Sequence, residues 1–378
     1  MKRSAERVPY LAALDTFRTV ASLLVVAVHP SFPTSLGTPE DRFGGALAVD
    51  FFFVLSGFVM SLNYGRAYGR DEAGRFLQGR FARIYPLHLA TLACFLGIEC
   101  LKLLAADRVS IDPSRRAFSA AGNSVQAFLC NLVLLNAHGL TSRLSFNGPS
   151  WSIGAEATCY LGFAVGVWLF TRGKARNLYT LFLALTAGCL WAGFRAASIG
   201  SPDASLGALR GVFGFGLGQF LHQFVEGRRE RAVGTMAAWR ILAAGLGVVG
   251  SALVAAGLSY RGGGIYLLAA SVIGWAALDR ETASVRWLDR IGATWFGKIS
   301  YGVYMWHGLV LWCVHRFLCQ ILRFPFTYTR GELHIGCSLA VGNAALVLTY
   351  LVTLVWAWLS YRWFEEPMRR WLRPKRSA

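Results

Sequence analysis

GCSLAVGNAALVLTYLVTLVWAWL, residues 336–359, contains no charged side chain. An α-helix needs about 20 predominantly apolar residues to cross the hydrocarbon core of a bilayer, and this stretch has that length. Its apolar residues do not alternate with polar ones, as they would along a half-buried strand. The stretch therefore predicts a membrane-spanning helix, and the rest of the chain can be compared with it.

The same pattern recurs throughout the 378 residues. The composition is 55% hydrophobic and 14% aromatic but only 15% charged, which is unlike an ordinary soluble domain. We expect an all-α polytopic membrane protein without strands, folded as a single domain over residues 1–378. Apolar windows predict about ten transmembrane helices, at residues 11–30, 46–63, 86–105, 151–170, 178–198, 205–225, 236–257, 263–279, 299–321 and 336–359.

The distribution of basic residues predicts the orientation. A net charge of +18 would suggest nucleic acid as a partner of a soluble protein, but here the basic residues sit in short links between apolar runs. They concentrate in alternate links, which places the N- and C-termini in the cytoplasm; only the link at 107–122 departs from this pattern. The basic tail from about residue 361 is then expected to contact anionic lipid.

Three shorter features complete the outline. Residues 123–137 are too few to cross comfortably and predict a re-entrant or interfacial helix on the outer side. The eight cysteines form no CxxC pair, so we interpret them as packing residues and expect neither a disulfide framework nor a metal site. Asp15 and Arg18 interrupt the first apolar stretch, which is therefore expected to remain as a span although Lys2, Arg3 and Arg7 precede it.

Ionisable residues in the first span require an explanation, because a charge inside a bilayer costs roughly several kcal/mol unless it is paired or hydrated. Asp15 and Arg18 are one turn apart and can pair. His29 follows Arg18 by about 16 Å along the helix axis and with only about 20° of angular drift, so the two line one face. Spacing alone leaves open a structural ion pair with an interfacial histidine.

Two carboxylates are predicted at a similar depth to His29. Asp50 opens the second span, and Glu156 lies one turn into the fourth. A carboxylate can orient an imidazole and raise its basicity, so this grouping suits general acid and base chemistry.

The ninth span contains ISYGVYMWH, in which Tyr304 and His307 share one helix face and Tyr301 lies one turn earlier. The alternative is an aromatic belt with a core histidine, and for this stretch taken alone it is the better explanation. In the sixth span, Gly214 and Gly218 have the spacing of a close helix contact.

Arg80 and Arg83 lie one helical turn apart on a predicted cytoplasmic link. Basic residues there are first of all a topology signal. Two guanidinium groups at this spacing can nevertheless bind a phosphate together.

Six stretches, in matching order and spacing, resemble the acyltransferase-3 family of integral membrane O-acyltransferases. The resemblance runs from about residue 10 to residue 370. The stretches are LDTFRTVASLLVVAVH, VDFFFVLSGF, RFARIYPLH, GPSWSIGAEATCYL, ISYGVYMWH and YRWFEEP.

The resemblance implies transfer of an acyl group, usually acetyl, from cytoplasmic acyl-CoA to hydroxyl groups of extracytoplasmic carbohydrate, in the inner membrane of a bacterial cell. It implies roles for the arginine and histidine of the first span, Arg18 and His29, and for the RxxR pair, Arg80 and Arg83. The family's Trp-Ser-x-x-x-Glu stretch maps onto Trp151, Ser152 and Glu156. This chain departs from many members in having Thr16 and Thr19 where they have glycines. We also expect no esterase-like domain after the membrane domain, so that the transfer is completed within that domain or by a separate protein.

The expected mechanism is that acyl-CoA docks on Arg80 and Arg83, with no permanently bound cofactor, and that its arm passes Arg18 to reach His29. His29 then acts as general base with Glu156 or Asp50, while Trp151, Tyr301 or Arg18 meets the oxyanion. Alternatively, His29 carries the acyl group covalently. Asp15, Ser152, Tyr304 and His307 are expected to support the site or the substrate.

Two other classes of function remain open. A proton-coupled transporter or flippase would use Asp15, Arg18, Glu156 and His307 as a relay. A scaffold or sensor would leave the buried charges unexplained. These residues do not identify the carbohydrate acceptor, which could for example be exopolysaccharide or O-antigen. A homo-oligomer and partner proteins of glycan assembly also remain open.

Overall fold

The computed structural model describes residues 10–36, 45–64, 70–104, 117–119, 123–141, 143–170, 173–196, 202–229, 236–256, 261–279, 282–329 and 332–374. Lys2, Arg3 and Arg7, both chain ends and most of the link at 107–122 lie outside these residues. The described chain is nearly all helical, as predicted.

A helix lies at each of the ten predicted spans. These helices are α1 (Ala12–Val28), α2 (Gly45–Tyr64), α3 (Arg70–Leu104), α5 (Trp151–Leu169), α6 (Gly173–Ala196), α7 (Pro202–Arg229), α8 (Met236–Ala256), α9 (Arg261–Leu278), α12 (Ser300–Arg316) and α13 (Leu339–Ser360). Among the described residues, three segments are long and apolar enough to cross a membrane by length and composition: Glu72–Leu104, Gly148–Leu169 and Leu339–Leu372. The remaining crossings stay predictions.

Shorter elements connect these helices. They are α4 (Val125–Leu132), the 3-10 turn η3 (Gly148–Ser150), α10 (Ala283–Gly292), α11 (Trp295–Lys298), the π-helical turns η4 (Phe317–Ile321) and η5 (Tyr361–Glu365), and α14 (Glu366–Leu372). The eight-residue α4 occupies the segment predicted to be too short to cross.

Two details differ from the sequence prediction. The expectation of no strands is wrong locally, because β1 (Phe326–Thr329) and β2 (Glu332–Ile335) pair antiparallel in the link after α12. Their β-branched and aromatic residues favour strands, but the pair is too short to show in a search for spans. In addition, α3 begins at Arg70 rather than near residue 86 and continues through Pro86.

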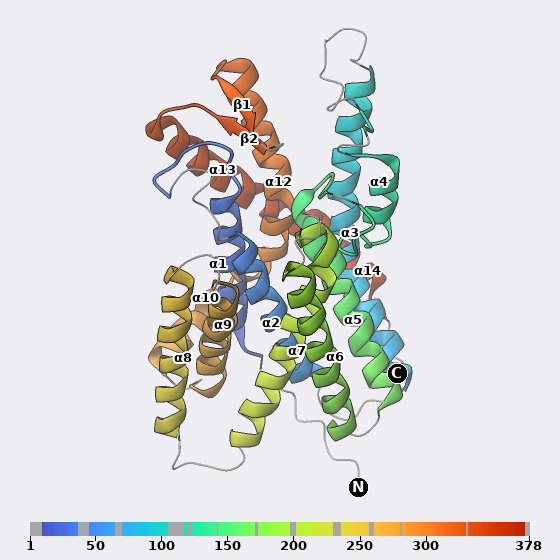
Figure 1. The fold of residues 1–378 in the computed structure, drawn as a ribbon, viewed down its shortest axis with the longest axis vertical. Coiled ribbons are helices and arrows are strands. Elements are labelled where there is room, and N and C mark those ends of the chain that lie inside the picture. The colour runs from blue at the N-terminus through green and yellow to red at the C-terminus, as the bar shows by residue number, and fades with distance from the viewer. Residues whose placement is uncertain are drawn as a thin grey trace.

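The helices pack as a bundle in which α2 and α7 come into close contact (Figure 1). A methyl group added to Gly218 of α7 would lie 1.9 Å from the carbonyl oxygen of Val54 in α2, and one added to Gly57 would lie 1.9 Å from the carbonyl oxygen of Phe215. The glycines therefore permit backbone contact, which confirms the packing interpretation of Gly218. On another side, α13 runs from the hairpin end to α14, which packs against α3 (Figure 1).

Candidate active site

A row of hydroxyl groups fixes α1 against the segment from α10 to α12. Thr16 donates to the carbonyl oxygen of Leu288 at 2.7 Å, Thr19 to that of Phe296 at 3.0 Å, and Ser22 to that of Ser300 at 2.9 Å. The three donors are spaced one turn apart on one face of α1 and are buried. Thr16 and Thr19, which stand where many members of the resembled family have glycine, thus help to set the register of α1 on its neighbours.

This register brings two histidines together at the C-terminal end of α1. The ring of exposed His29 meets the ring of His307 from α12 edge-on, with centroids 5.1 Å apart. His307 is fully buried, with 0% of its surface exposed. We call His29, His307, Tyr304 and Ser152 the histidine cluster.

Backbone carbonyl groups determine which nitrogen of each ring carries the proton. Nδ1 of His29 lies 2.7 Å from the carbonyl oxygen of Val25, and Nδ1 of His307 lies 2.6 Å from that of Tyr304. A carbonyl oxygen only accepts, so each Nδ1 is the donor and Nε2 is the basic atom of the neutral ring. Nε2 of His307 is buried and makes no hydrogen bond with the described residues.

Tyr304 connects α12 to the start of α5. Its hydroxyl group donates to the carbonyl oxygen of Pro149 at 2.8 Å and lies 2.8 Å from the hydroxyl oxygen of Ser152. Asn147 supports the same junction by donating to the carbonyl oxygen of Met305 at 3.0 Å. The Tyr304 ring is 5.8 Å from the His307 ring, so these contacts hold the histidine cluster together.

A second group of polar residues lies between α3 and α5. The guanidinium carbon of Arg80 lies 5.9 Å from the ring centroids of each of Tyr64, Phe76 and Tyr160. This is a cation held by aromatic faces. Its Nε is buried and makes no hydrogen bond with the described residues.

Acidic residues lie near the second arginine. The carboxylates of Asp15, Glu156 and Glu365 all act electrostatically on the Arg83 guanidinium. Glu156 accepts hydrogen bonds from Tyr160 at 2.5 Å and from Ser56 at 3.0 Å. We call Arg80, Arg83, Glu156, Tyr160 and Glu365 the arginine cluster.

Two contacts lie at the edge of the arginine cluster. Glu365 reaches it because Gly302 has no side chain: a methyl group there would lie 2.9 Å from Oε1 of Glu365. Asp15 pairs with Arg18, as predicted, and also accepts from the hydroxyl group of Tyr10.

Two helices contribute to both clusters. In α5, Ser152 belongs to the histidine cluster and Glu156, one turn later, to the arginine cluster. In α12, Gly302 adjoins Glu365 while Tyr304 and His307 form the other end. Along α1, Arg18 and His29 are separated by about 16 Å. The two clusters are thus adjacent parts of one structure.

The match to a family model decides the class of this chain. The model of an acyltransferase domain, acyltransferase-3, matches residues 11–362, which include both clusters except Glu365. The chain belongs to the acyltransferase-3 family. This membership supports an acyltransferase embedded in a membrane, and it favours an enzyme over the transporter and the scaffold.

Curated relatives agree with this assignment. The chain is 36% identical to protein 2 in the picA locus of Rhizobium radiobacter over 37% of its length and 73% of that protein. It is 32% identical to the acyltransferase MdmB of Streptomyces mycarofaciens, over 46% of the chain and 43% of MdmB. It is 24% identical to the peptidoglycan O-acetyltransferase OatA of Listeria monocytogenes, over 96% of the chain and 56% of OatA.

The chain thus spans about half the length of the two named acyltransferases. No solved structure matches it.

Two of the predicted site residues, Asp50 and Trp151, lie together in other surroundings. Asp50 is 1% exposed and is bound by Arg210 through both carboxylate oxygens, at 2.6 and 2.8 Å, and by the hydroxyl group of Tyr266 at 3.0 Å. Trp151 packs beneath Arg210, whose guanidinium carbon is 5.5 Å from the indole centroid. These contacts join α2, α5, α7 and α9.

Tyr301 is also engaged elsewhere. Its hydroxyl group donates to the carbonyl oxygen of Ile84 at 2.5 Å, two residues before Pro86 in α3. This bond attaches α12 to the turn of α3 that precedes Pro86.

Sequence reasoning missed Arg210 and Glu365. Arg210 lies within an apolar run, so the rule that drew attention to Arg18 would have found it. Glu365 was visible only as part of YRWFEEP, and no spacing in the sequence indicates that it approaches Arg83.

Proposed function

We propose that this acyltransferase moves an acyl group, acetyl in the first instance, from cytoplasmic acyl-CoA to a hydroxyl group of carbohydrate outside the cytoplasm or at the membrane. The observation that carries the proposal is the contact of the exposed His29 ring with the buried His307 ring, 5.1 Å between centroids. One ring is accessible to an acceptor, and the other holds it in place.

In this proposal His29 is the general base. Its Nε2 takes the proton from the acceptor hydroxyl group as that oxygen attacks the thioester carbonyl carbon. The tetrahedral intermediate collapses, the carbon–sulfur bond breaks, and the CoA sulfur leaves with the proton from His29. The hydrogen bond from Nδ1 to Val25 keeps the imidazole in the tautomer that this step needs.

The assignments of the other expected residues follow from their positions. The contacts of Asp50 make it a structural ion-pair partner, and we assign no oxyanion role to Trp151 or Tyr301. Arg18 is about 16 Å from His29 along α1, too far to donate to the same tetrahedral carbon, so we assign it to the path of the donor arm. Glu156 supports that path from α5 through Tyr160 and Ser56.

We assign the phosphates of acyl-CoA to Arg80 and Arg83. The buried Nε of Arg80, which makes no hydrogen bond with the described residues, supports this assignment, because an unpaired buried donor costs about 1–3 kcal/mol that an anion would recover. The aromatic rings around Arg80 fix the guanidinium group without neutralising it. A phosphate would compete with Glu156 and Glu365 for Arg83.

The test is to compare surface glycans of bacteria that express the wild-type chain or His29→Ala. Mass spectrometry should find an acetylated sugar in the first strain and lose it in the second, at equal levels of membrane-inserted protein. Equal acetylation in both strains would refute the proposal. Labelled acetyl-CoA without acceptor separates the two histidine mechanisms, because only the covalent one leaves the label on the protein.

A further inference from the structure

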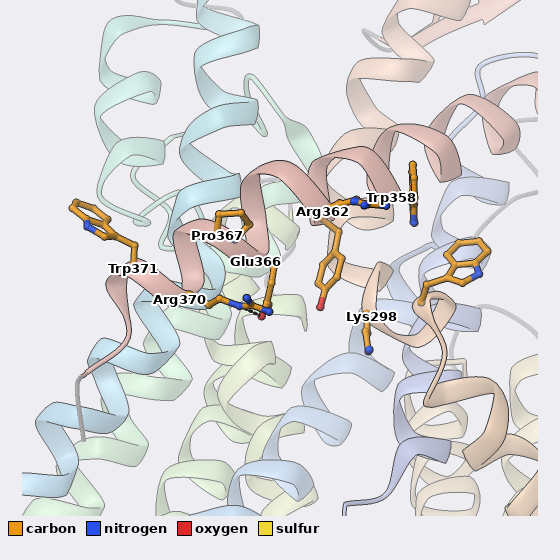
Figure 2. A pocket seen from close by; sticks show the side chains of 9 residues that line it. Lys298, Trp358, Arg362, Glu366, Pro367, Arg370 and Trp371 are labelled. Atoms are coloured by element: carbon orange, nitrogen blue, oxygen red, sulfur yellow. Dashed lines mark hydrogen bonds and ion pairs between the residues drawn. The ribbon is translucent and has the colours of Figure 1, made fainter. Parts of the chain in front are cut away.

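An open groove of about 820 Å³ lies outside both clusters, where η5 and α14 pass α11 (Figure 2). Its walls combine tryptophan rings with basic side chains: Trp295, Trp358, Trp371, Lys298, Arg362 and Arg370. None of these residues has a role in the proposed transfer. We infer that this groove binds the phosphate headgroup of an anionic membrane phospholipid.

The charge of the groove is complementary to such a headgroup. Three cations line it together with a single carboxylate, Glu366. That carboxylate is already paired with Arg370 at 2.9 Å (Figure 2). It also pairs with Arg369. The guanidinium carbon of Arg362 lies 5.7 Å from the centroid of the Trp358 ring. This contact holds the guanidinium group at the groove and leaves its charge in place. The groove therefore retains a positive charge.

An apolar stripe on α13 leads directly into the groove. Val347, Leu351 and Val355 are spaced one turn apart and are 57%, 58% and 58% exposed. The same face continues to Trp358 and then to Arg362. From Val347 to Trp358 the rise along the α13 axis is about 16 Å, long enough for the stripe to lie beside much of one acyl chain.

This continuity distinguishes a lipid from a soluble phosphate ligand. Acyl chains lie on the stripe while the headgroup meets Lys298, Arg362 and Arg370. Tryptophan residues in such a position are typical of a bilayer interface. The three basic residues all belong to links or the tail that the sequence places in the cytoplasm, where the leaflet is rich in anionic lipid.

The experiment uses the purified full-length chain, stripped of lipid in detergent and titrated with phosphatidylglycerol or phosphatidylcholine under native mass spectrometry. We expect the wild type to bind phosphatidylglycerol about tenfold more tightly. The triple variant Lys298→Gln, Arg362→Gln, Arg370→Gln should lose this preference. Arg316→Gln is the matched control, because Arg316 lies over Trp312 in the same way, at 5.4 Å, but outside the groove.

Three results would overturn the inference. The first is equal affinity of the wild type for the two lipids, a result that does not depend on whether any variant folds. The second is an unchanged preference in the triple variant. The third is displacement of bound phosphatidylglycerol by equimolar CoA or glycerol phosphate, because a ligand without acyl chains should not compete.

Discussion

The contact between His29 and His307 depends on the hydroxyl row from Thr16 to Ser22, which places α1 against α12. The spacing of His29 from Arg18 is visible in the sequence, but His307 lies far along the chain. Sequence spacing constrains neighbours within one helix. It does not constrain which helices meet, so the histidine cluster could be predicted only in part.

Asp50 was predicted to take part in catalysis, but its contacts are structural. Its depth in the second span suggested general acid or base chemistry, yet Arg210 and Tyr266 occupy its oxygens. Asp50→Ala leaves a buried arginine uncompensated, so the free energy of unfolding should fall by about 3–5 kcal/mol. Thermal unfolding of the purified variant measures this loss.

The double variant Asp50→Ala, Arg210→Ala is the control for that loss. It removes both charges and should recover part of the stability. If Asp50→Ala is as stable as the wild type but inactive, Asp50 takes part in catalysis and the structural assignment is wrong.

The arginine pair permits a second test at this scale. Replacing Arg80 and Arg83 by glutamine should raise the KM for acyl-CoA about tenfold, because charge-assisted bonds to phosphate are lost. Steady-state kinetics with Arg143→Gln as the control measures the change, since Arg143 is exposed on a loop. An unaltered KM would show that the pair serves only topology and packing.

At the scale of elements, the sequence located all ten major helices but not all of their ends. Apolar windows end where charges begin, so they could not show that α3 continues back to Arg70 through Pro86. The hairpin of β1 and β2 was missed because four-residue strands in a link carry no span signal.

The contact of α2 with α7 gives a prediction for elements. Gly218→Ala should destabilise the protein by about 1–3 kcal/mol, because the new methyl group would meet the Val54 carbonyl oxygen and force the helices apart. Gly97→Ala is the matched control: nothing lies within 4 Å of its added methyl group, so better helix propensity should leave stability equal or higher. If both variants unfold at the wild-type temperature, the close contact is not important for stability.

At the scale of the whole molecule, the predicted orientation can be tested directly. In a cysteine-free background, Ser35→Cys should react with an impermeant maleimide on intact cells, whereas Ser284→Cys should react only after lysis. Both serines are exposed and follow predicted spans at opposite ends. Labelling of Ser284→Cys on intact cells would show that the predicted orientation, or the number of spans before residue 284, is wrong.

The central claim is that His29 transfers the acyl group from CoA to a glycan. The most direct measurement uses the full-length chain in nanodiscs with acetyl-labelled acetyl-CoA and a surface-glycan extract, and follows CoA release and glycan labelling together. The wild type should show both at equal rates, and His29→Ala should be slower by at least about 100-fold. His138→Ala, whose ring contacts Thr158 instead, should retain both activities. CoA release and glycan labelling by His29→Ala at the wild-type rate would contradict the account.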